Sequence, residues 1–392
     1  MNNKSLILGS LFALAFSLGS ASSIFSKSHK QDGTCAGICD TQGVHPDWPC
    51  QCNVFCVQFG DCCPDYETAC LSCADRCNSA FNANLPCQCT TQCQNFNDCC
   101  ADYGDVCDGG QPEPGTVTNA EIIQLVDDMS AVDFNNMASG ITFDLQSSTT
   151  GSDTSPNPLF PEEIPEVYLQ IPTVAALLNL FDNYHPLVSI QESFTPEQES
   201  EIEVFLDAVF DTEVFRVMTD FFLAKEMFDS QESLRAKLKE VWFNRYCRDA
   251  KDADDHPLQP KCNEGSSGFE HVFLGEQKSN SISGVHGWIY LALQERAGNI
   301  NYFGHMTTRT FGDKGSAIEF AFTWDGLKKP ISSVFVGASP ELDLASLSVC
   351  FLLRPNSLCS VSISGVGVKI QTYTEAYNGQ QLVGTAYYDV SS

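Results

Sequence analysis

The chain has 392 residues, of which 43% are hydrophobic, so it can bury a sizeable core and is expected to form two or more domains. Its 50 acidic residues outnumber its 21 basic residues and give a formal net charge of −29 at pH 7. Because proteins hold phosphate groups with lysine and arginine, this charge argues against general binding of nucleic acids. A nucleic-acid site would have to be a local basic pocket or depend on a bound cation.

Residues 1–21 have the pattern of a secretory signal peptide. Lys4 precedes the apolar stretch Leu6–Leu18, and the small residues at 19–21 predict cleavage after Ala21. An uncleaved membrane anchor is the alternative, but the apolar stretch is shorter than the roughly 20 residues that a helix needs to cross a bilayer. We therefore expect a secreted, extracellular protein in which disulfides form.

Two cysteine-rich repeats follow. Their cysteine spacings agree except for one residue between the second and third cysteines, so the region is an internal duplication. Each repeat is too small to fold on a hydrophobic core and needs cross-links. Zinc is the alternative, but adjacent cysteine pairs, the lack of interleaved histidines and export favour disulfides. The sixteen cysteines are Cys35, Cys39, Cys50, Cys52, Cys56, Cys62, Cys63 and Cys70, then Cys73, Cys77, Cys87, Cys89, Cys93, Cys99, Cys100 and Cys107.

This pattern resembles the somatomedin B domain, over residues 31–70 and again over residues 71–108. Such domains usually bind other extracellular proteins, so the resemblance implies a protein partner. Spacing alone cannot choose among the 105 pairings of eight cysteines. The resemblance implies Cys35–Cys52, Cys39–Cys70, Cys50–Cys63 and Cys56–Cys62, then Cys73–Cys89, Cys77–Cys107, Cys87–Cys100 and Cys93–Cys99. The candidate partner contacts, which could instead pack on the cystines, are Phe55, Phe59, Tyr66, Phe96 and Tyr103.

Residues 109–116 are rich in glycine and proline and predict a linker to a large domain at 117–392. The first half of that domain is predicted to be mostly helical. A capping box at Thr195–Gln198 begins one helix, and Arg245 and Arg248 follow another. These arginines either face a nucleic acid or are solvated charges at a helix end. The apolar faces of the two helices are Ile202, Phe205, Leu206 and Val209, and Leu234, Leu238, Val241 and Trp242.

The later half alternates between apolar and polar residues with a period of two, which predicts half-buried antiparallel strands. The predicted strands cover residues 318–323, 347–353, 361–363 and 366–370. The fold class is therefore α+β, with a helical first half, antiparallel sheets after it, and two small disulfide-rich modules in front. Two further disulfides are hypotheses: Cys247 with Cys262, and Cys350 with Cys359 across a short turn.

The stretch Gly268–Glu295 contains two histidines, His271 and His286, each bounded by glycines. Histidines with a pKa near about 6.5 can act as general base and general acid at neutral pH, and a lysine can stabilise charge on a phosphate. Such a set would suit attack of a ribose 2'-OH on the adjacent phosphorus. By spacing alone the signal is weak, because a histidine is more often a structural residue.

The sequence motifs around these histidines are specific for one family. EHVFLGE at 270–276, SGVHGWIYLALQE at 283–295 and WDGLKKPISSVFVGASPE at 324–341 closely resemble the poly(U)-specific endoribonuclease family, EndoU or XendoU. The resemblance covers residues 117–392. It implies cleavage of single-stranded RNA at uridylates by 2'-OH attack, with Mn²⁺ assistance and 2',3'-cyclic phosphate ends.

The resemblance also implies roles for single residues. His271, His286 and Lys329 would be catalytic, with Lys328 the less favoured neighbour of Lys329. Glu270 and Glu276 would support them, either by orienting the histidines or by helping to hold Mn²⁺. Thr385 and Tyr387 in GTAYY would line the uracil and ribose pocket. Tyr388 is the departure, because proline usually follows the pocket tyrosine in the family.

Two points stay open at this stage. The sequence does not indicate which histidine is the base, and it shows no dedicated set of metal ligands. The alternative function is a non-catalytic extracellular adaptor that binds RNA or protein, which the net charge and the duplicated modules favour. A protease is disfavoured, because neither an HExxH motif nor a Gly-x-Ser-x-Gly motif occurs.

Overall fold

The computed structural model describes residues 117–248, 264–278 and 280–391 and, between residues 34 and 107, an interrupted set that includes all sixteen cysteines of the repeats. The chain divides into two compact units, Met1–Glu113 and Pro114–Ser392. The predicted signal peptide and linker lie outside the described residues, as do Phe55, Phe59, Phe96 and Cys262. Within the described part, no helix is long and apolar enough to cross a bilayer.

The first unit is built on cystines. The eight disulfides are those that the somatomedin B resemblance implies: Cys35–Cys52, Cys39–Cys70, Cys50–Cys63, Cys56–Cys62, Cys73–Cys89, Cys77–Cys107, Cys87–Cys100 and Cys93–Cys99. Tyr66 and Tyr103 begin the short helices α2 (Tyr66–Cys70) and α4 (Tyr103–Cys107) and are buried among the cystines. These two tyrosines are therefore core residues, and the prediction that they contact a partner is wrong.

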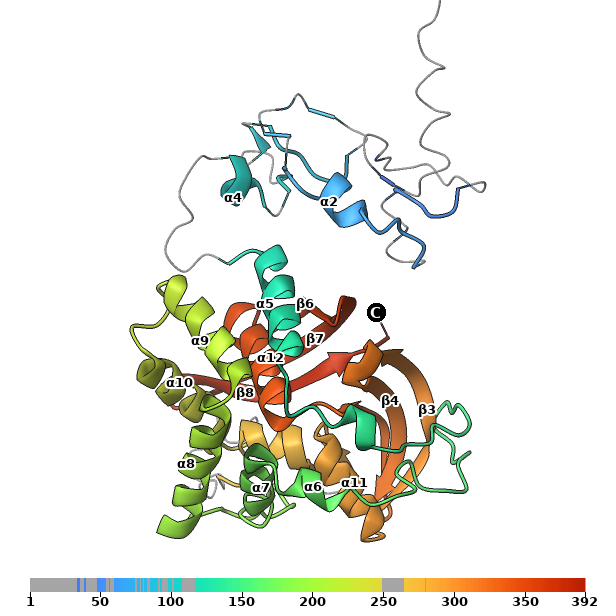
Figure 1. The fold of residues 1–392 in the computed structure, drawn as a ribbon, viewed down its shortest axis with the longest axis vertical. Helices are drawn as coiled ribbons and strands as arrows, with labels where there is room; N and C mark the ends of the chain where they lie inside the picture. The colour runs from blue at the N-terminus through green and yellow to red at the C-terminus, as the bar shows by residue number, and fades with distance from the viewer. Residues whose placement is uncertain are drawn as a thin grey trace, which may run out of the picture. The chain divides into compact units, whose positions relative to one another are not determined.

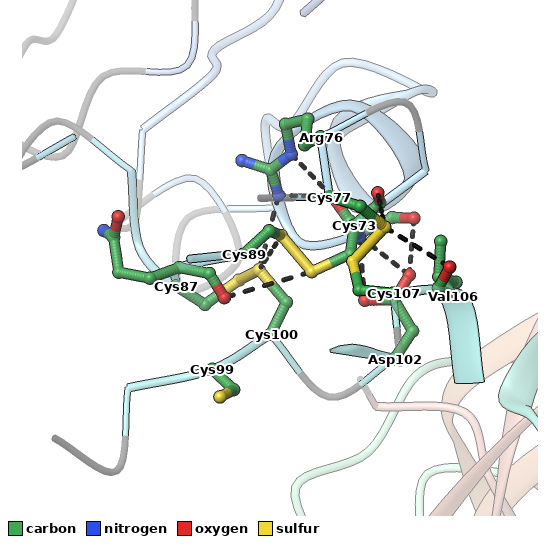
Figure 2. The surroundings of a disulfide bond; sticks show 12 residues. Cys73, Arg76, Cys77, Cys87, Cys89, Cys99, Cys100, Asp102, Val106 and Cys107 are labelled. Atoms are coloured by element: carbon green, nitrogen blue, oxygen red, sulfur yellow. Dashed lines mark hydrogen bonds between the residues drawn. A yellow bond between two sulfur atoms is a disulfide. The ribbon is translucent and has the colours of Figure 1, made fainter. Parts of the chain in front are cut away.

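The two modules share one hydrogen-bonding device as well as their disulfides. The carboxylate of Asp65 accepts the backbone N–H of Cys35 at 2.8 and 2.9 Å. In the second module, Asp102 accepts the N–H of Cys73 at the same two distances. Figure 2 shows this aspartate beside the cystine cluster of the second module. Because the device recurs at matching positions, the duplication extends from the cysteines to the polar contacts around them.

Helices dominate the first half of the second unit, as predicted. The capping box forms at Thr195 and Gln198 and begins α8, and both predicted apolar faces are buried. These helices are α5 (Asn119–Ala131), α6 (Glu166–Leu169), α7 (Pro172–Asn179), α8 (Pro196–Phe210), α9 (Glu213–Ala224) and α10 (Gln231–Phe243). A single-turn 3-10 helix, η2 (Ala138–Gly140), follows α5, and another, η5 (Gly312–Lys314), lies among the later strands.

Three antiparallel sheets make up most of the second half. The first contains β1 (Glu276–Lys278) and β2 (Ser281–Ser283). The second has the order β3 (Ile300–Thr310), β4 (Ser316–Trp324), β5 (Leu327–Val336). The third has the order β6 (Leu358–Ile363), β7 (Val366–Tyr377), β8 (Gln380–Asp389). The predicted strands near residues 318, 361 and 366 are thus confirmed as parts of β4, β6 and β7.

One predicted strand is wrong. Residues 347–353 belong to the helix α12 (Pro340–Leu353), which lies among α5, α7, α9, β7 and β8 (Figure 1). Eleven residues in a row, Pro340–Cys350, are buried, because α12 is covered on all sides. A helix without a polar face has no period of 3.6, so the chance alternation of Leu347, Val349 and Phe351 imitated a strand.

The disulfide Cys350–Cys359 forms, and it joins the end of α12 to β6 rather than closing a hairpin. Cys247 is also in a disulfide, while its predicted partner Cys262 lies outside the described residues.

Candidate active site

The first histidine lies on a π-helical turn, η4 (Glu270–Leu274). Its closing hydrogen bond runs from the Gly275 N–H to the Glu270 carbonyl over 2.8 Å, five residues apart. Such turns are rare and occur frequently at functional sites. Strand β1 begins directly after the turn, and this places the side chain of Glu276 against that of His271.

Glu276 holds His271 in a fixed orientation. Nδ1 of His271 lies 2.6 Å from Oε2 of Glu276, and the same oxygen forms an ion pair with Nε of Arg248 at 2.8 Å. The Ser266 hydroxyl donates to the other carboxylate oxygen. Burial by itself would raise the pKa of Glu276, but Arg248, His271 and Ser266 outweigh it and lower the pKa. With the Nδ1–H donated to an ionised carboxylate, Nε2 of His271 is left for a substrate.

The second histidine is joined to the first by backbone hydrogen bonds. After β2, the Val285 and His286 N–H groups donate to the carbonyls of His271 and Val272, at 3.2 and 2.7 Å. Gly284 makes this approach with φ of 70°, and a Cβ there would lie 1.7 Å from the His271 carbonyl oxygen. Only glycine fits this position without displacing the backbone. Helix α11 (Trp288–Arg296) then begins two residues after His286.

His286 has a different kind of partner. Its Nδ1 lies 2.9 Å from the backbone carbonyl of Ser333, and its ring stacks on Tyr387 with centroids 5.1 Å apart. Burial, and after it the charge of Lys329, keep the pKa of His286 well below its usual value. Burial followed by the Arg248 charge lowers the pKa of His271 to about 4 in spite of Glu276. Both imidazoles are therefore neutral in the free protein at pH 7.

Lys329 completes the cluster. It is buried on β5, whose Ser333 carbonyl contacts His286, and its charge acts on the pKa of both histidines, so the three groups lie close together. Burial lowers the pKa of Lys329 to about 8, while Glu276 acts in the opposite direction. Lys328 is exposed and lies over the Phe303 ring instead. The two neighbouring lysines thus differ in burial and in the side chains around them.

Thr385 and Tyr387 are partly exposed on β8, on one face of the third sheet. Tyr388 points to the other face, where it is buried in the core and packs edge-on against Phe335. Tyr388, which stands where proline is usual in the family, therefore adds a side chain to the core and none to the face that carries Thr385 and Tyr387. Tyr387 keeps its contact with His286.

Glu270 is buried, and neither of its carboxylate oxygens has a hydrogen-bond partner among the residues that the structure describes. Glu192 is buried near it: one oxygen accepts the His185 N–H at 2.8 Å, and the other has no partner in the same described part of the chain. Burial first, and then the neighbouring Glu276, raise the pKa of Glu270 well above its usual value. Burial also raises the pKa of Glu192 to about 7.

The sequence analysis did not find Glu192, Ser266, Ser333 or the role of Arg248. Glu192 and Ser333 contact residues far away in sequence, and a backbone carbonyl such as that of Ser333 carries no residue-type signal. For Ser266 and Arg248, the only available signal was their nearness in sequence to the EHVFLGE motif. The interpretation of Arg248 as a solvated charge at a helix end is wrong, because its side chain is only 15% exposed and is paired with Glu276.

The comparisons with known proteins identify the family of the second unit. The sequence model of the family described as Endoribonuclease XendoU matches residues 121–388, which is more than half of the chain. The protein belongs to the XendoU endoribonuclease family. The somatomedin B model matches twice in front of this family region, over residues 33–72 and 71–110.

Relatives in the XendoU family span nearly the whole chain. A mouse protein named uridylate-specific endoribonuclease is 33% identical over 402 aligned positions, covering 92% of this chain and 94% of its own. A protein of the same name from Paralichthys olivaceus is 37% identical, covering 90% and 93%. The solved structure of XendoU, titled a splicing-independent snoRNA-processing endoribonuclease, aligns with a TM-score of 0.57 and 28% identity, covering 71% of this chain and 99% of its own.

Proposed function

We propose that this protein is a secreted uridylate-specific endoribonuclease that cleaves single-stranded RNA by attack of the ribose 2'-OH on the neighbouring phosphorus. The observation that carries the proposal is the closeness of His271, His286 and Lys329, which the contacts of η4, His286 and β5 bring about. The names of the relatives support uridylate as the site of cleavage. The products are a 2',3'-cyclic phosphate and a free 5'-hydroxyl.

The partners of the two imidazoles suggest which is base and which is acid. His286 donates its Nδ1–H to a neutral carbonyl, so its Nε2 lone pair is available and the ring remains neutral. His271 faces the carboxylate of Glu276, which favours an imidazolium. We therefore assign His286 as the base that takes the 2'-OH proton and His271 as the acid that protonates the leaving 5'-oxygen.

The bound phosphate changes the balance of charge in the pocket. An anionic phosphodiester raises the pKa of groups that become cationic, and His271 is then protonated together with Lys329. Lys329 stabilises the charge that develops on the phosphorane-like state. Thr385 and Tyr387 lie next to His286 on β8, and they would bind the uracil and ribose.

Mn²⁺ assistance is part of the proposal. Glu270 and Glu192 are buried carboxylates with unpartnered oxygens, and oxygen donors of this kind suit hard divalent cations. These two residues would hold the ion, and its positive charge would offset the acidic field around the pocket.

Secretion is proposed on the signal-like residues 1–21 together with the disulfide-rich modules, which suit an oxidising compartment. The two somatomedin B modules are proposed to bind an extracellular protein. Their described surface offers Phe81, an exposed aromatic residue of the second module, as one contact.

The test is end-group analysis of a defined product. The mature protein is incubated with Mn²⁺ and an RNA that contains one uridylate, and with the same RNA carrying 2'-deoxyuridine there. We expect one cut with a cyclic phosphate end in the first RNA and none in the second. His271→Ala and His286→Ala should each lower the rate by about 10²-fold or more, whereas His305→Ala, a histidine of β3 outside the pocket, should not.

Cleavage that is unaffected by His271→Ala would overturn the proposal. RNA binding without products under any metal would instead favour the adaptor function.

A further inference from the structure

One face of the third sheet extends the pocket. In register across β7 and β8, Tyr373 pairs with Thr385, Gln371 with Tyr387 and Lys369 with Asp389. Because side chains alternate along a strand, these residues lie on the same face. The other face is buried and carries residues such as Ile370, Thr372, Ala386 and Tyr388.

Tyr373 is the exposed aromatic residue on this outer face, with 47% of its surface accessible. A β-bulge at Tyr373 and Thr374 shifts the register opposite Gly384, and a Cβ on Gly384 would lie 3.1 Å from the Tyr373 carbonyl oxygen. Bulges turn side chains away from the regular pleat and are common beside active sites. The glycine lets the two strands approach closely at the bulge.

Tyr373 is connected to the catalytic pocket. Burial, and after it the nearby phenol of Tyr373, raise the pKa of Tyr387, whose ring stacks on His286. His286, Tyr387 and Tyr373 thus form a row that runs from the pocket onto the outer face of the sheet. An exposed aromatic side chain is ordinary at a random surface position. At the end of this row it lies opposite Thr385 and beside Tyr387, the residues proposed to bind the uridine.

We infer that Tyr373 is a stacking platform for the base of a nucleotide adjacent to the cleaved uridylate. The inference rests on the proposed function for the identity of the ligand and adds a second nucleotide site to it. Stacking on an aromatic side chain accepts any base, because every base has a flat π face. The uracil pocket would therefore provide the sequence preference, and Tyr373 would provide affinity for the chain.

The test uses binding, so that it does not depend on cleavage. A fluorescent RNA carries 2'-deoxyuridine at its single uridylate, and two versions of it have an abasic ribose at the 5' or at the 3' neighbour. Fluorescence anisotropy gives Kd for each RNA with the wild-type protein, Tyr373→Ala and Tyr373→Phe. Phe134→Ala is the matched control, because Phe134 is a 78% exposed aromatic residue in the loop after α5.

We expect the wild-type protein to bind one of the two abasic RNAs about 10-fold more weakly than the intact RNA. Tyr373→Ala should weaken binding of the intact RNA by a similar factor and no longer distinguish it from that abasic RNA. Tyr373→Phe, which keeps the ring and loses the phenol contact with Tyr387, should still distinguish them. Phe134→Ala should behave like the wild-type protein.

Two outcomes overturn the inference. In the first, the wild-type protein binds both abasic RNAs as tightly as it binds the intact RNA. In the second, Tyr373→Ala distinguishes the abasic RNAs from the intact RNA as well as the wild-type protein does. The expected pattern without cleavage of normal RNA would keep the Tyr373 site and refute the proposed reaction. Normal cleavage of RNA, together with unchanged discrimination in Tyr373→Ala, would keep the proposed reaction and refute the Tyr373 site. Thermal melting of each variant shows that the fold is intact.

Discussion

At the scale of single residues, buried charge is organised around Glu276. A buried carboxylate is costly unless it is paired and hydrogen-bonded, and Arg248, His271 and Ser266 together meet that need. Arg248 also donates to the carbonyl of Gly384 at 2.9 Å, next to Thr385. One guanidinium therefore fixes both the carboxylate that contacts His271 and the strand β8.

The pairing of Glu276 with His271 predicts a pH effect. In Glu276→Gln the carboxylate that favours the imidazolium is lost, so the pKa of His271 falls further. A general acid with a lower pKa is deprotonated at lower pH. The descending limb of kcat against pH, which reports the RNA-bound enzyme in which His271 is protonated, should therefore move to lower pH. At pH 7 the rate should fall by about 10²-fold. The measurement is a pH–rate profile on the single-uridylate RNA.

The matched control for that profile is Glu341→Gln. Glu341 is equally buried, but it lies on α12 and its carboxylate accepts the side-chain amide of Asn135. Its pH profile should follow that of the wild-type protein. An alkaline limb that stays in place in Glu276→Gln would contradict the assignment of His271 as the acid.

At the scale of elements, the site depends on a π-helical turn and a two-stranded sheet that bring two histidines fifteen residues apart into one pocket. Gly275 and Gly284 make the crossing of these segments feasible. Both have a positive φ, and a Cβ on either would lie within 2.1 Å of an atom of the other segment. The close approach of the two segments thus explains why glycine is needed at positions 275 and 284, beside the histidines.

This crossing predicts different results for two glycine substitutions. Gly298 also has a positive φ, of 79°, but a Cβ there would meet nothing within 4 Å. Gly298→Ala should cost only the backbone strain, about 1–2 kcal/mol of unfolding free energy, with full activity. Gly284→Ala adds a clash with the His271 carbonyl and should cost about 3 kcal/mol or more and lower the cleavage rate.

Denaturant unfolding and cleavage assays on both variants make the measurement. Equal losses of stability and activity in Gly284→Ala and Gly298→Ala would show that the close approach at Gly284 is not important.

At the scale of the whole molecule, the two units are stabilised by different means. The second unit has one continuous hydrophobic core that joins its helices to its sheets. The cores of the two small modules consist of cystines and one tyrosine each. Removing a native disulfide from a small secreted domain typically costs about 2–5 kcal/mol, so reducing conditions should affect the two units unequally.

We expect limited proteolysis in increasing dithiothreitol to cut first between residues 35 and 107. A resistant fragment that starts near Pro114 should remain and keep its endoribonuclease activity. Mass spectrometry identifies the fragments, and the unreduced protein is the control. If the second unit were digested at the same dithiothreitol concentration as the modules, the idea that its core suffices would be wrong.

The sequence by itself determined the features that depend on local chemistry. The cysteine framework, the capping box of α8, the buried faces of α8 and α10, and the strands β4, β6 and β7 follow from spacing and periodicity, because each such signal is contained within a short segment. The motifs around His271, His286 and Lys329 likewise indicated the family.

The tertiary structure decided what depends on contacts between distant segments. Helix α12 has no polar face, so only its burial among helices and strands shows that it is a helix. The pairing of Arg248 with Glu276, the nearness of Glu192 to Glu270 and the carbonyl of Ser333 beside His286 join residues 28 to 78 positions apart. Side-chain charge and burial at such distances are set by the fold, and no local pattern encodes them.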